Sequence, residues 1–167
     1  MMSAADVIEV LDLLDSAGID CWLEGGWGVD ALLEEQTREH DDIDMVVELD
    51  KVPLMFEILG GHGFTLVHGS PPKNFVLGDG RDRRVDVHPV RFDERGRGLY
   101  IMDNGETWPF PAQGFTGRGT ILKRPVKCMS PEVQVICHSD YELDDDDRRD
   151  MQALRDHFGV KLLPQQE

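Results

Sequence analysis

The segment DIDMVVEL, which begins at Asp42, sets two aspartates one residue apart at the start of an apolar stretch rich in β-forming residues. This composition predicts a β-strand. Residues i and i+2 of a strand point to the same face, so Asp42 and Asp44 lie side by side with their Cβ atoms about 6–7 Å apart, and Ile43 and Met45 face the core. Two such carboxylates repel each other unless a cation lies between them, and Mg²⁺ or Mn²⁺ is the usual cation for oxygen ligands.

A second segment, RRVDVHPV, repeats this pattern, with Asp86 and His88 on one face and valines on the other. If the two strands are neighbours, three carboxylates converge, which is the set of groups required for metal-assisted phosphoryl or nucleotidyl transfer. Two acids would hold a metal on a triphosphate, and the third would share that metal or take a proton from the attacking hydroxyl. For an isolated D-x-D, two solvated acids at the end of a strand remain the simpler interpretation.

Gly25 and Gly26 follow a short apolar stretch and precede a predicted helix over roughly residues 28–33. Glycines before a helix allow backbone N–H groups to approach a phosphate, although a plain turn explains the pair equally simply. Thr37 and Arg38 offer a hydroxyl and a guanidinium to phosphate oxygens, and pairing of Arg38 with a nearby acid is the alternative. Neither a Walker A motif nor G-x-G-x-x-G occurs in the chain.

The order of predicted elements is helix, strand, helix, strand, helix, several strands and then helices. This order is typical of the α+β class, with helices packed on a mixed sheet and a helical C-terminal end. Ser3 with Asp6 predicts the start of the first helix, and the last helix is expected from about Asp144 to Phe158, before Gly159. Residues 103–119 are predicted as hairpin and loop, and TILKRPVKCM as one strand.

The formal net charge of −16 argues against nucleic acids and anionic membranes as partners, and favours cationic small molecules. Such a surface needs a divalent metal wherever it meets a nucleoside triphosphate. The three cysteines include no C-x-x-C pair, which is consistent with a reducing cytoplasm. We expect neither an export signal nor a membrane span, since the first residues are acidic and their apolar positions are interrupted.

The glycine pair, the short helix, D-x-D and a later aspartate together resemble the nucleotidyltransferase superfamily that includes DNA polymerase beta. The segments GGWGVDALL, QTREHDDID and VDVHPV are similar to the small antibiotic nucleotidyltransferases of the lincosamide and aminoglycoside 2″-O type. The resemblance continues through CMSPEVQVICHSDYEL to the final acidic helix ending in HFG, and so covers most of the chain.

This resemblance implies a nucleotidyltransferase fold, with a catalytic domain over residues 1–125 and a helical segment over residues 126–167 packed on it as one compact unit. It implies transfer of AMP or another NMP from a nucleoside triphosphate to a hydroxyl of a small-molecule antibiotic, with Mg²⁺ or Mn²⁺ and release of pyrophosphate. Asp42, Asp44 and Asp86 would be the catalytic and metal-binding set, with Asp86 as general base. The triphosphate would be contacted by Gly25, Gly26, Trp27, Asp30, Thr37 and Arg38.

Acids and aromatic residues suit a cationic aminosugar, because carboxylates pair with ammonium groups and rings cover apolar faces. The candidate acceptor residues are Glu48, His88, Tyr100, Glu106, Trp108, Glu132 and Tyr141. For the aromatic residues and the histidine among them, a purely structural role is the alternative. A homodimer is possible, since a second copy would complete a deep pocket on a small domain. Three other functions remain open: a toxin-type enzyme that nucleotidylates a protein, a non-catalytic nucleotide-binding module, and a metal hydrolase that also uses His40.

Overall fold

The computed structural model describes residues 1–167 and combines five α-helices, nine β-strands and three short 3₁₀ helices, which confirms the predicted α+β class. The α-helices are α1 (Ala4–Ser16), α2 (Gly25–Leu33), α3 (Val52–Gly60), α4 (Pro131–Cys137) and α5 (Asp145–Phe158). The strands are β1 (Cys21–Glu24), β2 (Ile43–Glu48), β3 (Thr65–Gly69), β4 (Phe75–Gly78), β5 (Arg84–Phe92), β6 (Gly98–Ile101), β7 (Thr107–Phe110), β8 (Gly117–Ile121) and β9 (Arg124–Cys128). The 3₁₀ helices are η1 (Leu49–Lys51), η2 (Ala112–Thr116) and η3 (Pro164–Gln166).

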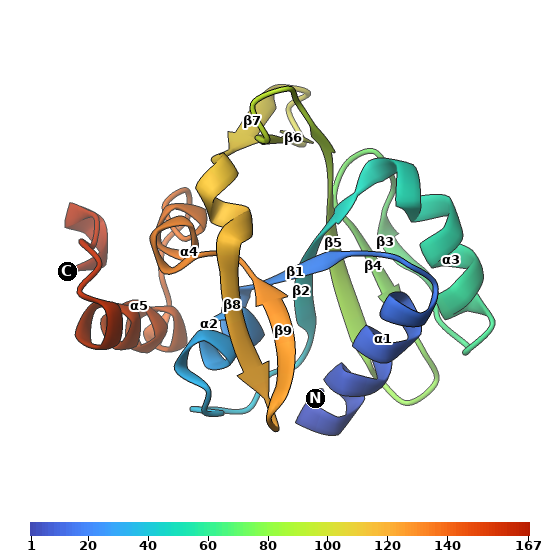
Figure 1. Ribbon diagram of the computed structural model, residues 1–167, viewed down its shortest axis with the longest axis horizontal. Coiled ribbons are helices and arrows are strands. Elements are labelled where there is room, and N and C mark those ends of the chain that lie inside the picture. The colour runs from blue at the N-terminus through green and yellow to red at the C-terminus, as the bar shows by residue number, and fades with distance from the viewer.

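All nine strands join one mixed sheet, in which the main path runs β3-β4-β5-β2-β1-β9-β8. The β6–β7 hairpin extends from β5 and projects beyond the rest of the sheet (Figure 1). Two pairs are parallel, β2 with β5 and β1 with β9, and the others are antiparallel. The pairing of β2 with β5 sets Asp44 directly opposite Asp86, so the two acidic segments are neighbours, which is the condition under which the sequence analysis expected the carboxylates to converge.

The helices lie in two groups, α1 with α3 on one side of the molecule and α2, α4 and α5 on the other (Figure 1). The predicted capping box at Ser3 and Asp6 is present, and α5 begins at a second one, formed by Asp144 and Asp147. Apolar residues of α1, α2, α3 and α5 pack with those of the strands in a buried core. No helix is both long and apolar enough to cross a lipid bilayer.

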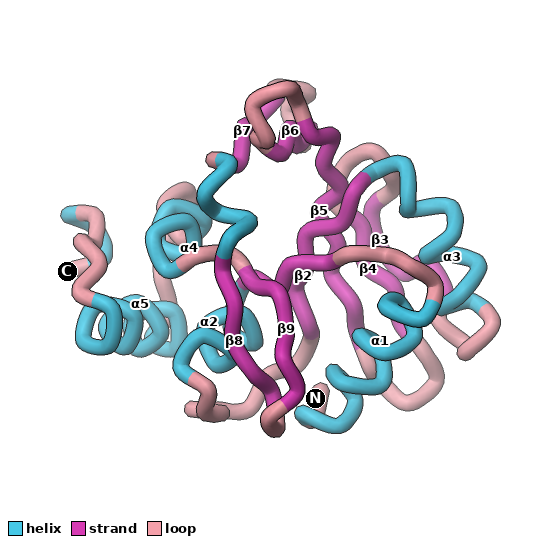
Figure 2. The backbone as a smooth tube through the Cα atoms, in the orientation of Figure 1, coloured by secondary structure: helices cyan, strands magenta, loops and turns pink.

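Two local predictions were wrong. The segment TILKRPVKCM is not one strand: it contributes to β8 and β9, which are joined by a tight turn at Leu122 and Lys123 (Figure 2). Both turn residues have positive φ, 48° and 68°, as in a type I′ hairpin turn, but neither is the glycine or asparagine that usually signals one. Helix α2 begins at Gly25 rather than Gly28, so the glycine pair forms its first turn. Strand β9 spans the boundary predicted between residues 125 and 126, and the division into a catalytic domain and a helical segment stays a prediction.

A buried arginine ties the β4–β5 turn to the first helix. The guanidinium of Arg83, which is 2% exposed, lies 2.7 Å from the Asp79 carboxylate and 3.0 Å from Glu9 of α1. The Phe64 ring lies 4.9 Å from the same guanidinium. Arg81 contacts the same two acids, but its side chain is 60% exposed.

Replacing Arg83 by Met should therefore destabilise the fold by about 3 kcal/mol, the lower end of the range for breaking a buried pair, because Glu9 is partly exposed. The matched change Arg81→Met should cost less than about 1 kcal/mol, since exposed ion pairs contribute little. Urea denaturation of the three proteins measures both values. Equal losses for the two variants would show that burial of Arg83 does not govern the stability of this corner.

Candidate active site

A cleft of about 380 Å³ lies where β1, β2 and β5 meet the first turn of α2. One wall is the β6–β7 region, with Tyr100, Met102, Trp108 and Phe110. The facing wall comes from residues 136–141 at the end of α4, together with Asp147 of α5. Side chains from the C-terminal helices and from the central sheet therefore share one cavity.

Acidic side chains gather at the base of the cleft: Glu24, Asp42 and Asp44 line it, and Asp86 lies next to Asp44 without lining it. Asp44 of β2 lies between Glu24 of β1 and Asp86 of β5 in the register of the sheet, and Asp42 lies on the bend just before β2. Burial, followed by repulsion from Asp42, Asp86 and Glu24, raises the pKa of Asp44 well above its usual value. Burial also raises the pKa of Asp86, although His88 and Asn74 partly offset it. The predicted aspartates are thus together, with a fourth acid that the sequence analysis missed.

Two further side chains contact the acids: Asn74 contacts Asp86, and His88 contacts Glu24. Asn74, just before β4, donates its side-chain amide to the Asp86 carboxylate and, at 3.3 Å, to the Val87 carbonyl. His88 Nδ1 lies 2.5 Å from Glu24 Oε1. Burial alone would lower the pKa of His88, but the carboxylates around it, Glu24 first and then Asp86 and Asp44, together outweigh burial and raise that pKa to about 9.

The glycine pair lies directly against these acids. Gly25 has φ of +59°, and a Cβ built on it would come 3.1 Å from the Asp44 Cγ, so a larger residue would be both strained and obstructed. A Cβ on Gly26 would collide with the ring of His40 and with the guanidinium of Arg38. The N–H groups of this first helical turn have no acceptors within the helix. The bare backbone therefore brings the first turn of the helix next to the carboxylates.

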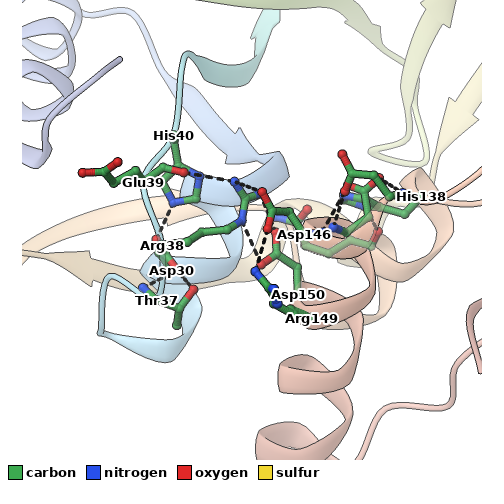
Figure 3. Close-up of polar contacts among 12 residues, drawn as sticks. Asp30, Thr37, Arg38, Glu39, His40, His138, Asp146, Arg149 and Asp150 are labelled. Carbon is green, nitrogen blue, oxygen red and sulfur yellow. Dashed lines mark hydrogen bonds and ion pairs between the residues drawn. The ribbon is translucent and has the colours of Figure 1, made fainter.

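Three of the predicted nucleotide-binding residues, Trp27, Asp30 and Thr37, do not line the cleft. Asp30 and Thr37 lie beside His40 (Figure 3). Asp30 is buried, lies 2.5 Å from His40 Nε2, and accepts bonds from the Thr37 N–H at 3.0 Å and hydroxyl at 2.7 Å. Trp27 is buried, and its ring centroid is 4.7 Å from that of His40. These contacts order residues 37–40. Gly25, Gly26 and Arg38 do line the cleft.

The predicted acceptor residues divide in the same way. His88, Tyr100, Trp108 and Tyr141 line the cleft, whereas Glu48, Glu106 and Glu132 lie outside it. The sequence analysis missed Glu24, although its position just before the glycine pair was a signal. It did not predict His138 or Asp147 as site residues either, yet both border the cleft.

The donor chemistry at the base of the cleft suits a hard divalent cation, since carboxylate oxygens gather there without a lysine. Burial first, and repulsion from neighbouring acids second, raise the pKa values of Asp44 and Asp86, and a bound cation would favour their charged forms. No three acidic, His or Cys side chains already form a group that could hold a metal. The metal ligands Asp42, Asp44 and Asp86 thus remain a prediction.

A mixed sheet that carries these acids beside a helix N-terminus is the architecture of a nucleotidyltransferase, and solved structures agree. A lincosamide antibiotic adenylyltransferase bound to lincomycin superimposes with a TM-score of 0.83 and 27% identity, over 92% of this chain and 97% of that one. A nucleotidyltransferase-fold protein from Thermotoga maritima, at 13% identity and a TM-score of 0.55, has the same fold over 83% of this chain and 85% of its own. More closely, the aminoglycoside-2″-adenylyltransferase family profile matches residues 6–154, so the chain belongs to that family of antibiotic nucleotidyltransferases.

The names of individual relatives refer to two antibiotic classes. A lincosamide resistance protein of Staphylococcus haemolyticus is 28% identical over 150 residues, covering 90% of this chain and 92% of the relative. A 2″-aminoglycoside nucleotidyltransferase of Klebsiella pneumoniae is 30% identical over 127 residues, covering 74% of this chain and 66% of the relative. The protein ANT(2″)-Ia, in its crystal structure with adenylyl-2″-tobramycin, has the same fold. Its TM-score is 0.72 and its identity 20%, over 93% of this chain and 89% of that one.

The pairing of His88 with Glu24 gives a test by titration. We expect an NMR titration of the His88 ring to give a pKa of about 9, and Glu24→Gln to bring it down toward the ordinary value of 6.5. Because this pKa is raised by folding, the pair stabilises the protein fully below pH 6.5 and the contribution is lost as the pH rises through about 9. Glu106→Gln, an exposed acid outside the cleft, is the control. A His88 pKa that stays at 9 in Glu24→Gln would contradict this assignment.

Proposed function

We propose that this protein transfers a nucleoside monophosphate, AMP in the first instance, from a metal-bound nucleoside triphosphate to a hydroxyl of a lincosamide or aminoglycoside, and releases pyrophosphate. The observation that carries the proposal is the position of Asp44 and Asp86, opposite each other on β2 and β5 and beside the first turn of α2. This arrangement sets carboxylates for a metal next to N–H donors for phosphate oxygens.

Each acidic residue then has a role that follows from its position. Asp42 and Asp44 would hold Mg²⁺ or Mn²⁺, which when bound neutralises the triphosphate and polarises its α-phosphoryl group. Asp86 would take the proton of the acceptor hydroxyl. The acceptor oxygen then bonds to the α-phosphorus, and the bond between the α-phosphorus and the oxygen of the leaving pyrophosphate breaks. The raised pKa of Asp86 suits a general base, because it makes the carboxylate a better proton acceptor. Asn74 keeps that carboxylate oriented.

The second half of the cleft supports a cationic acceptor with apolar faces. Tyr100, Trp108 and Phe110 offer rings on one wall, and Asp140 and Asp147 offer carboxylates on the other. Rings pack on the apolar faces of a sugar, and carboxylates attract its ammonium groups. The lincosamide and aminoglycoside enzymes among the relatives favour these two acceptor classes.

The C-terminal helices belong to the same functional unit in this proposal. Residues 1–125 supply the catalytic carboxylates, and residues 126–167 supply one wall of the cleft. Protein nucleotidylation and non-catalytic nucleotide binding are less well supported, because the acids are all present beside a cleft of small-molecule size. The homodimer remains a prediction from the small size of the domain.

Mass spectrometry of a panel of lincosamides and aminoglycosides, incubated with the protein, Mg²⁺ and the four ribonucleoside triphosphates, tests the reaction. We expect one antibiotic class to gain the mass of one nucleoside monophosphate. Asp44→Asn and Asp86→Asn should each lower the rate by at least about a hundredfold, because each removes a charged group that acts on the reacting phosphate or hydroxyl.

Asp50→Asn is the matched control for these substitutions. Asp50 follows β2, is 70% exposed and pairs with Arg91 on the surface, so its replacement should leave the rate unchanged. Turnover in Asp86→Asn equal to that of the wild type would disprove the proposed mechanism. Label that appears on a protein instead of an antibiotic would favour nucleotidylation of a protein partner.

A further inference from the structure

An arginine in the loop between α2 and β2 is held by a residue of the C-terminal helix. Arg38 donates from Nη2 to Asp150 Oδ2 at 2.8 Å and from Nε to Asp150 Oδ1 at 3.4 Å (Figure 3). Its Nη1 donates to the Glu39 carbonyl at 3.2 Å. The Asp150 side chain is only 3% exposed, so it has little access to water as an alternative partner.

This contact fixes the guanidinium beside the glycine pair. Arg38 Nη2 lies 2.7 Å from the place that a Cβ on Gly26 would occupy, so the guanidinium lies against the first turn of α2. Arg38 is also the only lysine or arginine that lines the cleft, and six acidic residues line it as well. A triphosphate that enters this acidic cleft therefore meets one permanent cation of the protein.

We infer that Asp150 is a positioning residue for the nucleotide: it holds Arg38 in the orientation in which the guanidinium binds the triphosphate, an inference that rests on the proposed function. A guanidinium has five N–H donors. Asp150 takes two of them and the Glu39 carbonyl takes one, so two remain for phosphate oxygens. An arginine that is already ordered loses less conformational entropy when the nucleotide binds.

The inference makes α5 part of the nucleotide site, although Asp150 itself does not line the cleft. Asp150 and Arg38 are 112 residues apart in the chain, and the bond between them joins the helical C-terminal segment to the loop before β2. Loss of this bond should reach the nucleotide through Arg38 alone. The acids that hold the metal would not be disturbed.

Isothermal titration of the protein with ATP, GTP, CTP and UTP in Mg²⁺ tests the inference without requiring turnover. For the nucleotide that the wild type binds best, we expect Asp150→Asn to weaken binding about fivefold to tenfold, the scale of ordering one long side chain. Asp146→Asn is the matched control on the same helix: Asp146 is 47% exposed and 3.9 Å from Arg38 Nη1, so this variant should change binding less than twofold. Tighter binding by Asp150→Asn would mean that Asp150 holds Arg38 away from the nucleotide, and would overturn the inference.

A double-mutant cycle separates positioning from a general structural role. If Asp150 acts through Arg38, Asp150→Asn should change nucleotide affinity less than twofold in an Arg38→Met background. In that background it should also raise the melting temperature, because it removes a buried carboxylate that has lost its partner. Equal weakening by Asp150→Asn in both backgrounds would overturn the inference.

Arg38→Lys gives a second test that does not depend on the folding of Asp150→Asn. Lysine keeps the charge but cannot make the paired bonds to a carboxylate, so we expect a similar loss of affinity. Unchanged affinity in a folded Arg38→Lys variant would overturn the inference. If the wild type binds none of the four nucleotides, the proposed function itself fails, whereas normal binding by Asp150→Asn rejects only the positioning role.

Discussion

The parallel pairing of β2 with β5 is the constraint on which the site depends, because it sets Asp44 opposite Asp86. Met45 and Val87 alternate with these acids and are fully buried in the core. A slip of one residue would expose this apolar face and bury the acids, so core packing fixes the register. The hydrophobic core thus holds together carboxylates that would otherwise separate.

The surroundings of the acids leave their charge largely uncompensated. Of the positive groups nearby, His88 pairs with Glu24, which is itself one of the four acids, and Arg38 pairs with Asp150. Repulsion within the cluster accordingly helps to raise the pKa of Asp44. The protein supplies ordered donors and acceptors, and the missing positive charge would arrive with the metal-bound nucleotide. This division also suits a cationic acceptor, which an acidic cleft attracts.

Local patterns predicted the parts of the structure that depend on neighbours in the chain. The capping box of α1, the end of α5 before Gly159 and the two acidic strands all follow from residues a few positions apart. Contacts between distant segments left no such signal: the bond between Arg38 and Asp150 joins residues 112 positions apart, and Glu24 meets His88 across the sheet.

Other features had a local signal that suggested a different structure. Leu122 and Lys123 form a hairpin turn without glycine or asparagine, so β8 and β9 looked like one strand. Asp30 and Thr37 carry oxygens that suit a phosphate or metal site, but Asp30 bonds to Thr37 and to His40, and neither lines the cleft. Polar residue types alone do not show whether a side chain faces the ligand or supports one that does.

Anomalous diffraction from crystals grown with Mn²⁺ and a non-hydrolysable nucleotide would test most directly the claim that the acids on β2 and β5 exist to hold a metal-bound triphosphate. We expect a manganese peak bound by Asp42 and Asp44 and close to Asp86, with the phosphates against the first turn of α2. A bound nucleotide whose manganese lies away from all three aspartates would contradict this account.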